Sequence, residues 1–95
     1  MPEGFVDVGT GLAVRWVEPP QCADDVPCEQ IEVYAVERCP SSVYLEANVL
    51  DSKERAIGVT SGQLGGLQKG RLGLITFPVQ ELDYANLELV EVSCD

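Results

Sequence analysis

Hydrophobic and polar residues alternate along three stretches in the first half of this chain, residues 12–17, 30–37 and 43–50. In the third stretch, the hydrophobic residues Val43 and Leu45 flank a tyrosine, and the alternation continues from there. A period of two places every second side chain on one face of an extended chain. The pattern therefore predicts three β-strands, each with one face in a hydrophobic core.

The second half of the chain predicts three further strands. Residues 51–54 have the composition of a hairpin turn, so residues 56–60 are expected to form the returning strand. A fifth strand over residues 71–77 ends at Pro78, because proline has no backbone N–H group to donate. Residues 87–94 form the last strand.

Three details of these later strands are less regular. Residues 61–66 are too rich in glycine for regular structure, and we expect an irregular segment whose leucines turn inward. In the strand over residues 71–77, two leucines compete with Ile75 and Phe77 for the inner face. The hydrophobic positions of the last strand change parity midway, which predicts a β-bulge near residues 89–90.

Six strand-like runs without a long helical period indicate an all-β fold. We expect an antiparallel β-sandwich of six to seven strands, immunoglobulin-like or related, stabilised by disulfides. A chain of 95 residues has room for one hydrophobic core, so residues 11–95 are expected to form a single domain. Residues 1–10 are polar and glycine-rich, and are interpreted as a flexible lead-in.

Charge and composition exclude several classes of function. The chain has 16 acidic and 6 basic residues, a formal net charge of -10 and no histidine. Without histidine, neither a Ser/His/Asp triad nor a Cys/His dyad can form, so we expect a protein that is not an enzyme and has no cofactor. The acidic surface would repel nucleic acid and anionic lipid, which leaves a protein partner and a monomeric chain as the expectation.

Four cysteines in so short a chain predict disulfides. Cys22 and Cys28 enclose a short polar loop and can form a local clip, which leaves Cys39 and Cys94 to link two neighbouring strands or the two sheets. Disulfides indicate an extracellular or cell-surface location, with the export signal or anchor expected outside the sequence given. The alternatives are a zinc site, although no paired C-x2-C motif is present, and four free thiols in the cytoplasm.

Residues 43–77 carry a family resemblance. A strand ending in Asp51, a short turn, the residues Leu67 to Gly70 and a strand ending in Phe77 resemble the FxLYD family of small bacterial extracellular β-sandwich domains. Asp51 matches the aspartate of the family name, whereas Ala47 and Leu50 stand at its two aromatic positions. The resemblance implies an accessory or interaction module without catalytic residues.

Two sets of residues are candidate binding sites. Tyr34, Val36, Tyr44 and Leu50 have the outward parity of their strands, and would form an apolar partner-binding patch if they shared one face. The acidic loop at residues 22–28 contains Asp24 and Asp25, whose carboxylates could bind a cation.

These residues lead to two hypotheses of function. The first is a non-catalytic secreted or cell-surface β-sandwich, serving as an interaction or accessory domain of a larger exported protein. The alternative is a small module that binds a ligand or cation through the acidic loop.

Overall fold

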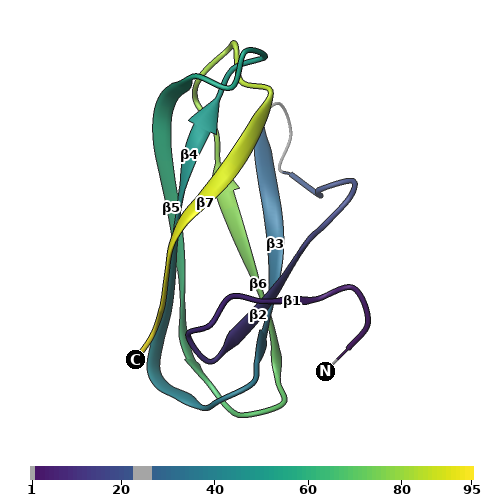
Figure 1. The fold of residues 1–95 in the computed structure, drawn as a ribbon, viewed down its shortest axis with the longest axis vertical. Helices are drawn as coiled ribbons and strands as arrows, with labels where there is room; N and C mark the ends of the chain where they lie inside the picture. Colours follow the sequence, from purple (N-terminus) through teal and green to yellow (C-terminus); the bar gives the residue numbers. More distant parts are fainter. Residues whose placement is uncertain (1, 23–26) are drawn as a thin grey trace.

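The computed structural model describes residues 2–22 and 27–95. They form seven strands: β1 (Val6–Asp7), β2 (Leu12–Trp16), β3 (Cys28–Ala35), β4 (Cys39–Leu50), β5 (Ala56–Leu67), β6 (Leu72–Pro78) and β7 (Asn86–Cys94). One antiparallel sheet has the order β1-β2-β3-β6, and the other has the order β5-β4-β7 (Figure 1). The two sheets pack face to face, which confirms the predicted β-sandwich.

The chain crosses from one sheet to the other after β3, β5 and β6. Strands β2, β3 and β6 therefore have the order of strands A, B and E of an immunoglobulin-like sandwich, and β5, β4 and β7 have the order of C′, C and F. In such a sandwich, strand G pairs with strand F. Among the described residues, no strand occupies that position beside β7.

The core lies between the sheets, where the alternating hydrophobic positions meet. Val14, Val33 and Ile75 face inward from the first sheet, and Val43 and Leu45 face them from β4. Nearly all of these side chains are excluded from water, and each buried aliphatic side chain stabilises the fold by about 1.5–3 kcal/mol. The alternation seen in the sequence is therefore the inward and outward parity of these strands.

The sequence predicted an irregular segment at the glycine-rich residues 61–66. These residues instead belong to the long strand β5. A methyl group on Gly62 would overlap Cγ2 of Ile75 in β6, and one on Gly73 of β6 would lie 2.9 Å from Cδ1 of Leu67. The prediction was wrong because these glycines have a packing role. They allow the edge strands β5 and β6 to approach closely, which closes this side of the sandwich.

The structure shows which side chains of β6 face the core and where the pairing of β7 is irregular. Ile75 and Phe77 face the core, whereas the leucines of β6 are about half exposed on the outer face. In β7, Leu89 pairs with Ala47 but the next pair joins Glu91 to the preceding residue of β4, so Val90 is an extra residue. The predicted bulge is confirmed.

The β4–β5 hairpin, predicted at residues 51–54, is held by the buried carboxylate of Asp51. Its Oδ1 accepts hydrogen bonds from the backbone N–H groups of Lys53 and Arg55, each at 2.9 Å. Its Oδ2 accepts a hydrogen bond from Nε of Arg55 at 2.8 Å. The backbone hydrogen bond from Arg55 is the main cause that holds the pKa of Asp51 below its usual value.

Part of the segment expected to be a flexible lead-in belongs to the first sheet. Val6–Asp7 forms β1 and pairs with β2 in antiparallel register. Phe5 is buried, and its ring centroid lies 6.1 Å from that of Tyr34 on the outer face of β3. The segment thus covers part of the outer face of this sheet.

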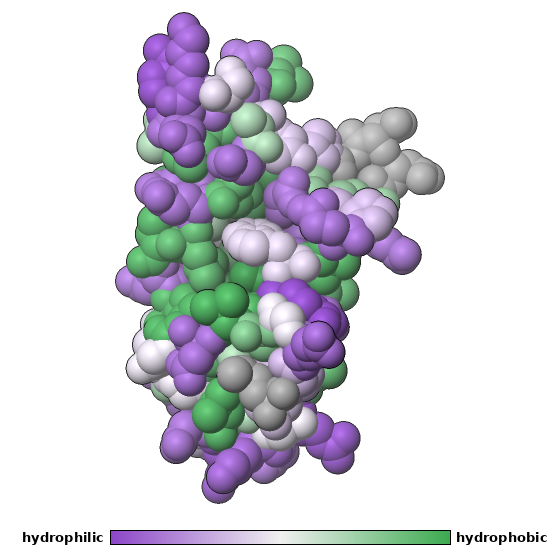
Figure 2. Space-filling model, turned by 45° about the vertical axis from the view of Figure 1, so that its right-hand side comes forward, coloured by the Kyte–Doolittle hydropathy of each residue, from purple (hydrophilic) through white to green (hydrophobic). Residues whose placement is uncertain are grey.

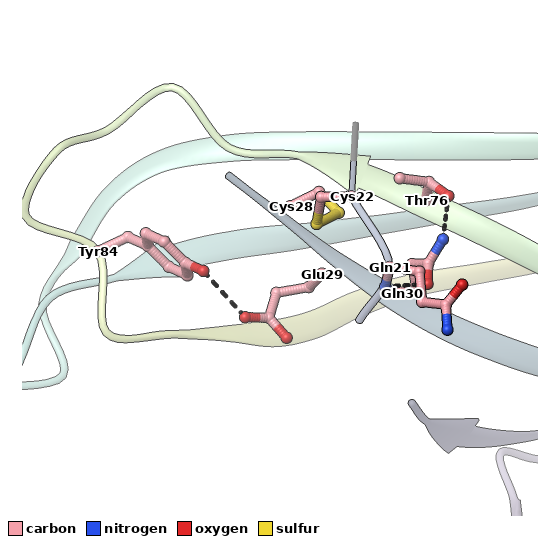
Figure 3. Close-up of a disulfide and its surroundings, with 7 residues drawn as sticks. All are labelled: Gln21, Cys22, Cys28, Glu29, Gln30, Thr76 and Tyr84. Atoms are coloured by element: carbon pink, nitrogen blue, oxygen red, sulfur yellow. Dashed lines mark hydrogen bonds between the residues drawn. A yellow bond between two sulfur atoms is a disulfide. The ribbon is translucent and has the colours of Figure 1, made fainter. Parts of the chain in front are cut away.

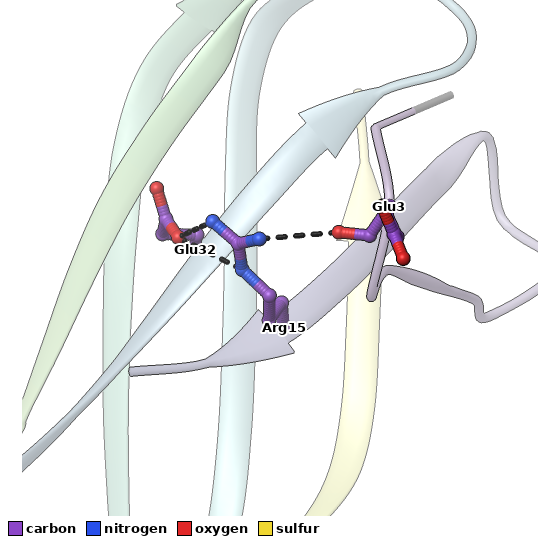
Figure 4. A network of polar contacts seen from close by, with 3 residues as sticks. All are labelled: Glu3, Arg15 and Glu32. Atoms are coloured by element: carbon purple, nitrogen blue, oxygen red, sulfur yellow. Dashed lines mark hydrogen bonds and ion pairs between the residues drawn. The ribbon is translucent and has the colours of Figure 1, made fainter. Parts of the chain in front are cut away.

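Arg15 anchors the same segment (Figure 4). Its guanidinium carbon lies 4.7 Å from the centroid of the Phe5 ring, a cation–π contact. Its Nε and Nη2 donate to Oε1 of Glu32 at 3.1 and 2.5 Å, and its Nη1 donates to the backbone carbonyl of Glu3 at 3.1 Å. The N-terminal segment is therefore bound to the sheet by both packing and polar contacts.

Candidate functional site

Both predicted disulfides are present, Cys22–Cys28 and Cys39–Cys94. The second joins the first residue of β4 to the last residue of β7, so it links neighbouring strands of one sheet rather than the two sheets. Because all four sulfur atoms are in bridges, the zinc and free-thiol alternatives are wrong. Two disulfides indicate an oxidising environment.

The Cys22–Cys28 clip closes the loop that precedes β3 (Figure 3). Beside it, the buried side chain of Gln30 accepts a hydrogen bond from the backbone N–H of Gln21 at 2.8 Å and donates one to the hydroxyl of Thr76 at 3.0 Å. The residue that precedes Cys22 is therefore bound to β3, and the same glutamine side chain links β3 to β6.

The loop between β6 and β7 is tied to β3 through Tyr84 (Figure 3). The Tyr84 hydroxyl donates a hydrogen bond to Oε2 of Glu29 at 3.1 Å. Burial is the main cause that raises the pKa of Tyr84, and the neighbouring Glu29 raises it further. The neutral Tyr84 hydroxyl and the Glu29 carboxylate bind each other, so this hydrogen bond holds the loop against β3.

Asp24 and Asp25, the candidate cation ligands, lie outside the described residues. Over residues 2–22 and 27–95, no group of three or more acidic or cysteine side chains is placed to hold a metal ion. Cation binding by the loop at residues 22–28 stays a prediction.

The four residues of the expected apolar patch are not brought together. Tyr34 lies on the outer face of β3 in one sheet, whereas Tyr44 lies on the outer face of β4 in the other sheet. Val36 follows the end of β3, and Leu50 is buried. Because the chain crosses between the sheets after β3, outward parity in β3 and in β4 points to opposite sides of the sandwich.

Tyr44 instead belongs to an acidic surface on the second sheet. Its hydroxyl lies 2.9 Å from Oε1 of Glu46, and this hydrogen bond is the main cause that raises the pKa of Tyr44. Glu46 pairs with Glu91 in β7, and Glu88 lies on the same outer face. Like charges directly opposite each other repel, so this surface favours positively charged neighbours.

Two hollows lie on the surface of the described residues. One has a volume of about 260 Å³, and its Thr60 hydroxyl donates a hydrogen bond to the backbone carbonyl of Pro78 at 2.7 Å. The other has a volume of about 430 Å³ on the outer face of the first sheet, with Gln30 and Glu32 among its lining residues. Thr60, Gln30 and Glu32 thus each bind another part of the chain.

The core is covered unequally on its two sides. Six of the seven partly buried hydrophobic residues that pack against it lie in β7, in β2 or just before β2; the remaining one is Leu64. We call five of them the open side: Val8, Trp16, Leu87, Leu89 and Val92. Figure 2 brings forward the side of the molecule with the N-terminal strands, and hydrophobic residues reach its surface between hydrophilic ones.

The open side follows from the position of β7 in its sheet. Within the described part of the chain, β7 pairs with β4 alone, so its other edge is free. The sequence predicted the inward side chains of β7 but not that β7 is an edge strand. Alternation within one strand shows which side chains face inward. Whether that strand lies at the edge of its sheet depends on the order of all the strands.

The described residues contain no helix long and apolar enough to cross a membrane. Comparisons with protein-family models, curated proteins and solved structures return no match to this chain. The resemblance to FxLYD-type domains therefore stays a prediction.

Proposed function

We propose that this protein is a non-catalytic interaction or accessory module of an exported protein, and that it binds a protein partner through the open side. The observation that carries the proposal is the row of core side chains, Leu87, Leu89 and Val92, that stay partly exposed along β7. The inward side chains of the neighbouring strand β4 are buried completely. The partly exposed row is therefore covered by β4 on one side and, among the residues that the structure describes, lacks a neighbouring strand on the other. Apolar surface of this kind is typical of partner sites.

A location outside the cytosol is supported by the two disulfides. Such bonds persist in oxidising compartments, and small exported domains use them because their hydrophobic cores are small. A non-catalytic role is supported by the absence of histidine from the sequence, which removes the commonest general base at neutral pH.

Site-specific photo-crosslinking in the cells that produce the protein tests the interaction. A photoreactive residue replaces Leu87 on the open side or, as the control, Leu74, which is 48% exposed on the outer face of the other sheet. We expect adducts with a second polypeptide from position 87 and none of the same mass from position 74. Equal labelling at both positions, or none at position 87, contradicts a binding role for the open side.

Alkylation of thiols before cell lysis tests the location. We expect all four cysteines to be protected as disulfides in the compartment where the protein resides. Four reactive thiols in the native compartment contradict a location outside the cytosol.

A further inference from the structure

We propose that the partner adds an extended strand to the free edge of β7, with apolar side chains facing the core and basic side chains facing outward. This inference rests on the proposed function and specifies how the open side is covered. It combines the backbone of β7, its inward side chains and its outward charges.

The backbone of β7 offers the first part of the site. The strand has nine residues and pairs with β4 along one edge. The other edge of an outer strand presents N–H and C=O groups that can pair with another extended chain. Addition of a strand to such an edge is a common mode of peptide recognition, in which main-chain hydrogen bonds supply affinity.

The inward side chains define the face of the added strand that meets the core. Leu87, Leu89 and Val92 point between the sheets, and Val8 and Trp16 contact the core from the first sheet on the same open side. Every second side chain of a strand placed beside β7 would enter this space. Apolar residues are required there, because a buried charge without a partner is strongly unfavourable.

The outward side chains define the other face of the added strand. Glu88 and Glu91 project from β7 on the outer face, and Glu46 lies opposite Glu91 on β4. A neighbouring strand places its outward side chains about 5 Å from those of β7. Lysine or arginine at these positions would relieve the repulsion among the carboxylates, and the net charge of -10 attracts a basic chain.

A second copy of this protein fits the edge poorly. It would bring its own Glu88 and Glu91 into the same row, along with another net charge of -10. Charged side chains and a bulge, here at Val90, are also the usual devices that prevent edge strands from pairing without selectivity. Of these two occupants, a strand from a different protein with complementary charges therefore fits better.

Three synthetic nine-residue peptides test the inference on the intact chain. The first alternates valine and lysine, the second alternates valine and glutamate, and the third is the valine–lysine peptide with a methyl group on every backbone amide nitrogen. The third keeps the charge but has no backbone N–H group to donate at either edge. Amide hydrogen exchange of β7 and the fluorescence of Trp16, the single tryptophan, report binding.

We expect the valine–lysine peptide alone to slow exchange of β7 amides, by about tenfold or more at saturation. The double variant Glu88→Lys/Glu91→Lys should weaken this peptide about tenfold and favour the valine–glutamate peptide instead. The control, Glu54→Lys/Asp83→Lys, changes the net charge equally at exposed turn positions outside β7 and should bind the valine–lysine peptide with less than about threefold loss.

Equal binding of the N-methylated peptide, or equal losses in the two double variants, overturns strand addition in favour of non-specific attraction between opposite charges. These results are separable from the test of the proposed function. If crosslinking at position 87 captures a partner while the valine–lysine peptide leaves β7 amides unprotected, strand addition is wrong and the interaction function stands. If crosslinking also fails, both are wrong.

Discussion

Gly65 and Gly66 are neighbours in β5, but a side chain would meet different surroundings at the two positions. A methyl group on Gly66 would overlap the carbonyl oxygen of Pro40 and lie 2.8 Å from its carbonyl carbon. A methyl group on Gly65 would have no atom within 4 Å. Backbone atoms cannot move aside as the end of a side chain can, so Gly66 is the position where glycine is required.

We therefore expect Gly66→Ala to destabilise the protein by about 1–3 kcal/mol, because β4 and β5 must separate locally. Gly65→Ala is the matched control and should change stability by no more than about 0.5 kcal/mol. Urea unfolding midpoints of the two variants provide the comparison. Equal midpoints would mean that β5 does not approach Pro40 as closely as the structure shows.

Asp51 links the stability of the hairpin to pH. Its pKa is lowered in the folded state, chiefly by the backbone hydrogen bond from Arg55, so folding favours the ionised carboxylate. This contribution is fully present above the usual pKa of an aspartate and is lost as the pH falls through the lower pKa of the folded state.

Asp51→Asn should lower the melting temperature by a few degrees at neutral pH and reduce the loss of stability in acid. Melting curves from neutral to strongly acidic pH measure both effects. Asp83→Asn, at an exposed position in the loop before β7, is the control for the loss of one negative charge. An Asp51→Asn variant with the acid dependence of the native protein would show that the Asp51 carboxylate does not sense the folded state.

The strands themselves were largely predictable. Alternation located β2, β3, β4, β6 and β7, because each has one buried and one exposed face. It failed for residues 61–66 in the second half of β5, where glycines such as Gly62 take the place of large apolar residues. A strand that lies close to the opposite sheet has no room for large side chains, so its sequence resembles that of a loop.

The two disulfides close loops of very different length. The Cys39–Cys94 bridge spans 55 residues and fixes the end of β7 to β4, whereas Cys22–Cys28 spans only 6 residues. In the chain-entropy model, a disulfide raises the free energy of unfolding by an amount that grows with the logarithm of the number of residues in the loop that it closes. The long bridge is therefore the greater contributor, and it stabilises the edge strand that carries the open side.

Removing Cys39–Cys94 with a double alanine substitution should lower the free energy of unfolding by about 4 kcal/mol, against about 2 kcal/mol for Cys22–Cys28. Denaturant unfolding of the two double variants under non-reducing conditions gives these values. Hydrogen exchange should also show faster opening of β7 in the first variant. A larger loss from the short clip would indicate that local contacts around Gln30, rather than loop entropy, dominate.

The two sides of the whole sandwich differ because the two sheets end differently. On one side, β5 and β6 approach each other through Gly62 and Gly73 and close the core. On the other side, no strand among the described residues pairs with the outer edge of β7, and the inward side chains of β7 stay partly exposed. The alternation of hydrophobic and polar residues identified which side chains point inward. Only the order of the strands shows which of these side chains have no neighbouring strand to bury them. The predicted patch failed for the same reason, since Tyr34 and Tyr44 have equal parity on opposite sheets.

A matched pair of leucine truncations tests whether β7 is uncovered in the isolated protein. Leu45 in the central strand is 0% exposed, and Leu45→Ala should cost about 2–5 kcal/mol through lost burial and a cavity. Leu89 is only partly buried, so its side chain already contacts water in the folded state, and Leu89→Ala should cost about half as much. Urea unfolding of both variants measures the difference. A cost at Leu89 equal to that at Leu45 would mean that the core is closed on both sides, and a partner strand would then have no apolar surface to cover.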